Sequence, residues 1–348
     1  MASSLDNSAW LQWMTTLMGG VSRQTYAATL PPDRFYCVLD ELPLHLIPRR
    51  AIRSLQSEVH RDHSLYLDPE CLLCSGGQVP EELASRKELL SGFALQGTVA
   101  WVRNHLSGNL LPFWLGPALE RMLRDLRPGE PAPSSMSNEA RRTLAAADIL
   151  VCEDESSQRK RAHEKTIQQA SPRFREKGYA PLGDLIHPFH VAALRRYYRY
   201  LIRTGAIVLG DGQSPRRYVA YNEPVARFFH QDIAATLSMV AGEKLKPSYV
   251  YMASYRSGAE LKKHTDRAQC EFSVTLCLDF SPEPMLETPW PIQLDTPTRT
   301  VTVYQALGDG LAYRGTRLPH YRSRLGEGQT STSIFFHYVA DDFAGSLD

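Results

Sequence analysis

The stretch KKHTDRAQCEF, residues 262–272, places His264 and Asp266 two positions apart, directly after a strand-like run. Side chains two apart on a β-strand point to the same face of the sheet. An imidazole and a carboxylate on one face can therefore bind the same metal ion. Because this pair also arises often by chance, the interpretation depends on a third ligand elsewhere in the chain.

The third ligand is offered by GDGLAYRGTRLPHYRSR, residues 308–324. This stretch reads as a Gly-Asp-Gly turn, a short strand and a second turn that leads to His320. Two histidines and one carboxylate form the facial triad of non-haem iron(II) oxygenases. Such a triad leaves three positions on the ion open, two for a chelating 2-oxo acid and one for dioxygen. We therefore predict His264, Asp266 and His320 as the metal ligands.

From about residue 245 to 340 the sequence resembles the catalytic domain of iron(II)- and 2-oxoglutarate-dependent dioxygenases, in particular the prolyl 4-hydroxylase-like branch. That branch opens with a Tyr-x-x-Gly-x5-His-x-Asp motif and continues with a Gly-Asp turn, an apolar strand and the second His. The matching residues here are Tyr255, Gly258, His264, Asp266, Gly308, Asp309 and His320. The resemblance covers the last 100 to 160 residues or so, and the first 180 show none that we can name.

The resemblance implies Fe(II) as cofactor, with 2-oxoglutarate and O2 as co-substrates. It implies hydroxylation of an unactivated C–H of an amino acid, a peptidyl residue or a natural product, with release of succinate and CO2. Asp266 makes hydroxylation the expected outcome, because related halogenases lack this carboxylate. Desaturation or cyclisation would use the same residues. The alternative is a metal-binding cupin-like protein of another class, such as an isomerase, a hydrolase or a sensor of a small acid.

One departure from the branch concerns the far carboxylate of 2-oxoglutarate. Relatives carry Lys or Arg about ten residues after the second His, whereas GEGQTSTS, residues 326–333, offers no cation. A buried carboxylate needs a partner. Arg322 faces the same side as His320 if the strand continues, and Arg324 is the second candidate. Hydrogen bonds could come from Tyr255 and from Gln329, Thr330 or Ser331.

The elements that must position these residues are short strands preceded by two helices. Apolar residues at helical spacing predict helices over 187–205 and 223–242, each ended by a glycine. Alternation then predicts strands over 248–255, 272–280, 299–307, 310–315 and 331–339. This order favours an α+β fold with a double-stranded β-helix (jelly-roll or cupin-like) core over 181–348, buttressed by helices.

The first half reads differently. Residues 1–126 are predicted as a mainly helical region, with helices over 47–59 and 113–126. Residues 127–180 are predicted as a linker and a charged segment, in which 127–142 are rich in Pro, Ser and charge. The charged stretch 152–169 is either a mobile loop or an exposed helix.

Composition excludes some classes of function. The 348 residues carry a formal net charge of +1, which implies no general attraction to nucleic acid or to a membrane surface. The N-terminus lacks the features of a signal peptide, and no apolar run is long enough to span a bilayer. The six cysteines show no regular framework, so a reducing cytoplasm is expected. The expected partner is a small-molecule or peptide substrate, and the oligomeric state is left open.

Other residues that could bind metals or ligands receive structural interpretations. His337 lies a whole strand beyond His320 and is interpreted as structural, as are the helix residues His187, His190 and His230. Arg267 is interpreted as support for the Asp266 carboxylate. A second metal signal combines His-x2-His with Cys-x2-Cys, which together could bind zinc. Its residues are His60, His63, Cys71 and Cys74.

Overall fold

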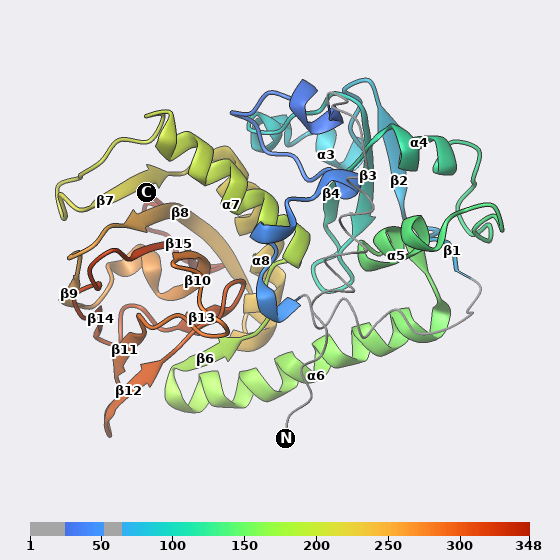
Figure 1. The fold of residues 1–348 in the computed structure, drawn as a ribbon. Helices are drawn as coiled ribbons and strands as arrows, with labels where there is room; N and C mark the ends of the chain where they lie inside the picture. Colours follow the sequence, from blue (N-terminus) through green and yellow to red (C-terminus); the bar gives the residue numbers. More distant parts are fainter. Residues whose placement is uncertain (1–24, 52–64) are drawn as a thin grey trace, which may run out of the picture.

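The computed structural model describes residues 25–51 and 65–348. Its C-terminal half contains a six-stranded and a four-stranded antiparallel sheet, in the orders β6-β13-β10-β15-β8-β7 and β12-β11-β14-β9 (Figure 1). The strands of the larger sheet are β6 (Tyr179–Leu182), β7 (Arg217–Tyr221), β8 (Leu245–Tyr255), β10 (Phe272–Ser281), β13 (Gly310–Tyr313) and β15 (Thr330–Ala340). Those of the smaller sheet are β9 (Leu261–His264), β11 (Ile292–Asp295), β12 (Thr300–Val303) and β14 (His320–Arg322).

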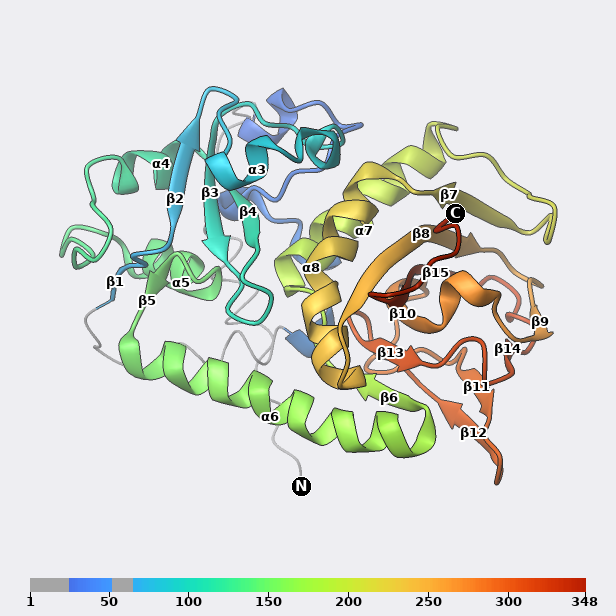
Figure 2. The same cartoon turned by 180° about the vertical axis from the view of Figure 1, so that it is seen from behind.

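The two sheets face each other through an apolar cluster that includes Ile292 and Leu294 of β11 and Leu311 and Tyr313 of β13. The outer face of the larger sheet is covered by α7 (Pro188–Arg203) and α8 (Pro224–Ala241) (Figure 2). The prediction of an α+β fold with an antiparallel core is therefore confirmed at this level.

Strand β10 shows how the sequence separates the two faces of the larger sheet. Phe272, Val274 and Leu276 belong to the core cluster that includes α7 and α8. The alternate positions are smaller and more polar: Ser273 and Thr275 are buried on the opposite face, toward the interior between the sheets. This separation arises because successive side chains along a strand point to opposite faces of the sheet.

Helices α7 and α8 lie within the predicted ranges 187–205 and 223–242, and α7 ends at Arg203, two residues before Gly205. Each has a proline at its first position, and the side chains of His187 and Glu223 accept hydrogen bonds from the first free backbone N–H groups. Gly242, with φ of +78°, ends α8 in the left-handed conformation that glycine adopts without strain. Both helices thus begin at defined residues on the outer face of the larger sheet.

The N-terminal region differs from its prediction. In the described part of residues 1–126 the main feature is a three-stranded antiparallel sheet of β2 (Leu72–Ser75), β3 (Thr98–Arg103) and β4 (Leu110–Leu115). The helices here are short: α3 (Glu81–Ala84), α4 (Pro117–Leu123) and the 3-10 turns η1 (Tyr26–Thr29), η2 (Leu39–Glu41), η3 (Leu44–Leu46) and η4 (Lys87–Leu90). Within the described residues this sheet takes the place of the expected helices, because β3 and β4 are buried on both faces and lack the alternation that would identify them as strands.

The two helices predicted in this region compare differently with the structure. Residues 113–126 divide between the end of β4 and α4, and the helix predicted over 47–59 falls mostly outside the described residues. The segment predicted as a linker and charged stretch contains α5 (Asn138–Ala146) and β5 (Leu150–Val151). Strand β5 pairs antiparallel with β1 (Tyr66–Leu67). The charged stretch belongs to α6 (Glu153–Lys177), which runs beneath both halves of the molecule (Figure 1).

The two halves share one apolar core. Phe35 lies 5.1 Å from Phe93, 6.3 Å from Tyr197 of α7 and 5.8 Å from Phe229 of α8, measured between ring centroids. The same cluster continues to the outer face of the larger sheet. In the part of the chain that the structure describes, no helix combines the length and apolar character needed to cross a membrane.

Candidate metal centre

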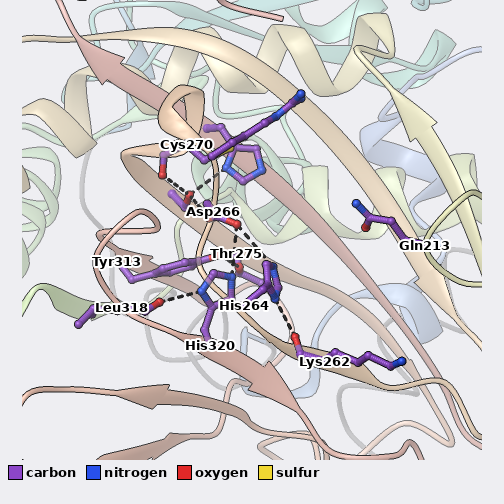
Figure 3. Close-up of polar contacts among 12 residues, drawn as sticks. Gln213, Lys262, His264, Asp266, Cys270, Thr275, Tyr313, Leu318 and His320 are labelled. Carbon is purple, nitrogen blue, oxygen red and sulfur yellow. Dashed lines mark hydrogen bonds and ion pairs between the residues drawn. The ribbon is translucent and has the colours of Figure 1, made fainter.

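Two neighbouring strands bring the predicted ligands together. β9 and β14 pair antiparallel with His264 directly opposite His320, and Asp266 follows two residues after the end of β9. The backbone N–H of Asp266 donates to the oxygen of Gly315 at 2.9 Å, which fixes the loop. Asp266 Oδ1 then lies 3.6 Å from His264 Nε2 and 3.5 Å from His320 Nε2 (Figure 3). The predicted triad is therefore one cluster in space.

The orientation of both imidazoles is set by backbone carbonyls. His264 Nδ1 lies 2.7 Å from the oxygen of Lys262, and His320 Nδ1 lies 3.0 Å from that of Leu318 (Figure 3). A carbonyl oxygen only accepts, so each Nδ1 carries the proton and donates it. Each ring then directs Nε2, its other nitrogen, toward Asp266. A ligating histidine held in this way by its other nitrogen is usual in metal sites.

Asp266 is an ionised carboxylate in this environment. Burial raises the pKa of its carboxyl, but contacts with His264 and His320 outweigh burial and hold the pKa well below the usual range. The Asp266 carboxylate in turn raises the pKa of His264. Two imidazole nitrogens and one ionised carboxylate oxygen thus converge on one space, where the negative charge of Asp266 would attract a metal cation.

Gly315 is required at the position where the chain passes behind Asp266. A Cβ there would lie 2.5 Å from the backbone oxygen of Cys270 and closer still to Asp266 Oδ2. The site therefore has no room for a larger residue. This residue was not singled out from the sequence, because the need for glycine arises from a tertiary approach.

The residues present fit an iron(II) ion. Two imidazole nitrogens and one carboxylate oxygen, all from one side, are the donor set of non-haem iron centres. His320 is 2% exposed and Asp266 is half-buried, whereas His264 is exposed, so the cluster opens to solvent on the side of β9. Among the described residues this is one of two groups whose ligand atoms all lie within 4.8 Å of one another, and the other group shares Asp266.

Arg322 is the second notable feature of the interior. It is 4% exposed and donates to the backbone oxygen of Trp290 at 2.5 Å and to Gln305 Oε1 at 3.2 Å. Its Nε is buried with no hydrogen-bond partner. No carboxylate in residues 25–51 or 65–348 forms an ion pair with it, and burial lowers the pKa of the guanidinium. A buried, uncompensated cation indicates an anionic ligand.

The other residues predicted to hold 2-oxoglutarate lie in two places. Tyr255 is buried with its ring 5.1 Å from that of Trp290, and Ser331 is buried opposite Tyr255 in the β8–β15 ladder. Both therefore share the interior with Arg322. Arg324 is exposed, with its guanidinium against Gly258, so it lies on the outer surface and not in the interior.

The remaining predicted residues have structural partners. Arg267 stacks on Tyr249 and donates to its hydroxyl at 3.2 Å, so it does not support Asp266 as expected. His190 and His230 contact backbone oxygens inside the core, as the structural interpretation implies. The zinc prediction depends on His60 and His63, which lie outside the described residues.

Comparison with known proteins adds structural neighbours. No family model and no curated protein matches the sequence. Among solved structures, about half of the chain is similar to the alpha-ketoglutarate-dependent epimerase SnoN from nogalamycin biosynthesis (TM-score 0.43, 15% identity, 51% of this chain and 83% of that chain). A Pseudomonas putida prolyl-4-hydroxylase is similar with a TM-score of 0.41 and 13% identity over 49% of this chain and 98% of that one.

A third neighbour is HygX from Streptomyces hygroscopicus, whose structure holds nickel, 2-oxoglutarate and hygromycin B. The match has 14% sequence identity and a TM-score of 0.39, and it covers 49% of this chain and 86% of HygX. Because the TM-scores of all three are 0.43 or lower, the functional assignment of this chain has to come from its own side chains.

Proposed function

We propose that this protein is an Fe(II)- and 2-oxoglutarate-dependent dioxygenase with a double-stranded β-helix core over residues 181–348. Its reaction is hydroxylation of an unactivated C–H in an amino acid, a peptidyl residue or a natural product. The observation that carries the proposal is the convergence of His264 Nε2, His320 Nε2 and Asp266 Oδ1, with both Nδ1 atoms committed to backbone carbonyls.

The second support is Arg322. A 2-oxo diacid that chelates an ion at the triad would direct its far carboxylate into the interior between the sheets. Arg322 offers a buried guanidinium there, and Tyr255 and Ser331 offer hydroxyl groups from the facing strands. This arrangement replaces the cation that relatives carry ten residues after the second His. A guanidinium binds a carboxylate through two parallel hydrogen bonds.

Each group of residues would have a defined task. With iron and 2-oxoglutarate bound, O2 would supply the oxidant: one of its atoms would end in succinate, with loss of CO2, and the other in the hydroxylated substrate. His264 and His320, through Nε2, and Asp266, through Oδ1, would hold the ion. The apolar interior around Trp290, Phe280 and Phe335 excludes water from the region next to Arg322.

The first experiment tests the centre by its colour. Anaerobic protein with Fe(II) and 2-oxoglutarate should show the weak visible charge-transfer band of the chelate. His264→Ala and Asp266→Ala should each abolish the band, because two ligands do not hold the ion in this geometry. His45→Ala is the matched control, since His45 is exposed and outside the cluster. An unchanged band in both site variants would rule out the triad.

A second measurement separates the dioxygenase from the cupin-like alternative. On admission of O2, the iron-loaded protein should convert 2-oxoglutarate to succinate, and Asp266→Ala should not. A protein that binds iron through the triad yet forms no succinate with any substrate offered would instead be a metal-dependent isomerase, hydrolase or sensor.

A further inference from the structure

A chain of three hydrogen-bonding groups leads from the metal centre into the larger sheet. Ser273 Oγ on β10 lies 3.1 Å from Asp266 Oδ2, the carboxylate oxygen that faces away from the histidines. The same Oγ lies 2.9 Å from Nδ1 of His337, the residue opposite Ser273 in the β10–β15 ladder. Asp266, Ser273 and His337 are thus linked in series, from a loop and two neighbouring strands.

The direction of the protons in this chain follows from its first member. An ionised carboxylate only accepts, so Ser273 donates its hydroxyl proton to Asp266. The backbone oxygen of Cys270, 3.2 Å from the same Oγ, is a neutral acceptor and competes less well. Ser273 must then receive a proton, and His337 Nδ1–H is the group that can give it. His337 is therefore the tautomer that leaves its Nε2 without a proton.

The surroundings of His337 agree with this assignment. His337 is 3% exposed, and its Nε2 is buried with no hydrogen-bond partner, as expected for a ring whose proton sits on Nδ1. The ring packs against Tyr249 and Tyr251, with centroids 4.7 Å and 5.8 Å away. An unsatisfied buried nitrogen costs about 1–3 kcal/mol, so a merely structural ring would be better replaced by an apolar one.

We propose that His337 and Ser273 are positioning residues that fix how Asp266 binds the metal. By engaging Oδ2, the pair leaves Oδ1 as the only carboxylate oxygen free to meet the ion beside the two histidines. Asp266 then contributes one ligand atom instead of two. A coordination position that a two-oxygen carboxylate would fill stays open for a co-substrate. This inference rests on the metal centre of the proposed function and assigns a role to a residue that the sequence presented as structural.

The test uses Co(II), whose binding and visible spectrum can be followed without turnover. Ser273→Ala and His337→Phe should each weaken Co(II) binding about tenfold, as is common when a residue behind a metal ligand is removed. The phenyl ring keeps the packing against Tyr249 and Tyr251 but has no donor. The visible band should also weaken in both variants, because a freed Asp266 can bind with both oxygens and raise the coordination number.

Two comparisons distinguish a hydrogen-bonded series from independent effects. The double variant should bind no worse than Ser273→Ala alone, because removing His337 has no further effect once Ser273 is gone. His337→Asn should restore binding to within about threefold of the parent, since its amide can donate from the place of Nδ1. His337→Gln, whose amide reaches the place of Nε2, should not. If His337→Phe does not fold, the comparison of His337→Asn with His337→Gln tests the proposal in its place.

Thr275→Val is the matched control, because it removes a hydroxyl from the same face of β10 that contacts Tyr313 and not Asp266. It should bind Co(II) like the parent. If the parent and His264→Ala bind Co(II) alike, the metal centre and the proposed function are both wrong. If His264→Ala fails to bind while Ser273→Ala and His337→Phe bind like the parent, or lose affinity additively, the positioning role alone is overturned.

Discussion

Replacing Arg322 by Met should remove the recognition of 2-oxoglutarate while leaving the fold and the metal centre in place. The guanidinium is almost fully buried and no described carboxylate pairs with it, so a bound dicarboxylate would complete a buried ion pair. Losing one partner of such a pair typically costs about 3–5 kcal/mol. At about 1.4 kcal/mol per factor of ten, the dissociation constant of 2-oxoglutarate should rise at least about a hundredfold.

The free protein should respond differently from the complex. Met removes a buried charge without a counter-ion, which favours the fold, but it also removes the donors to Trp290 and Gln305. These effects oppose each other, and each amounts to about 1–3 kcal/mol. We therefore expect little change in the melting temperature of the free protein, whereas the increase that 2-oxoglutarate produces in the parent should disappear.

The assay compares two ligands that differ only in the far carboxylate. Calorimetric titration of the anaerobic, metal-loaded protein with 2-oxoglutarate and with 2-oxopentanoate should show a strong preference for the diacid in the parent. Arg322→Met should lose the preference and bind both ligands weakly. Arg324→Met is the control and should behave like the parent, because Arg324 is exposed beside Gly258. If Arg322→Met keeps the preference, or Arg324→Met loses it, the assignment of Arg322 is refuted.

The remaining predictions concern the loop behind Asp266 and the acid side of the stability curve. Gly315→Ala should abolish Co(II) binding, because the new methyl group meets Asp266 and the backbone of Cys270, and binding equal to the parent would contradict the close approach. Burial lowers the pKa of His190 to about 3, so the unfolded chain takes up a proton there first as the pH falls below about 6.5. The stabilisation that the neutral ring gives to the folded state is complete above that pH and is lost as the pH falls. The loss reaches about 2 kcal/mol at pH 5. In urea unfolding, the free energy of unfolding should fall between pH 7 and pH 5 by about that amount less in His190→Phe than in the parent. Equal decreases in both proteins would disprove that the ring is buried in its neutral form.

Patterns in the sequence were sufficient to predict that His264, Asp266 and His320 lie together and that Arg322 faces the interior. The alternation along β14 buries His320 and Arg322 on one side, as expected, although the pairing with β9 is irregular between them. The side chains of His264 and Asp266, two positions apart, likewise lie next to each other in the structure. Within each of these two pairs the residues lie two positions apart, so the geometry of one strand or one loop determines their relation, whereas the resemblance indicated that the two pairs meet.

Relations between distant segments could not be predicted in this way. The apolar alternation of β10 identified a strand but not which face met the helices, because both faces are buried. His337 received a structural interpretation because its partner Ser273 is 64 residues away and is revealed only by the pairing of β10 with β15. In the N-terminal region, strands without alternation resemble buried helices in composition.

The aromatic contacts around Phe35 determine where the chain can be shortened. A protein that started at residue 181 would lack the first half of β6 and would leave Tyr197, Phe228 and Phe229 without Phe35 and Phe93 to cover them. Exposing three such side chains costs about 5–9 kcal/mol, which is comparable to the whole free energy of unfolding of a typical domain. The C-terminal sheets and the region before them are therefore best expressed and engineered as one unit.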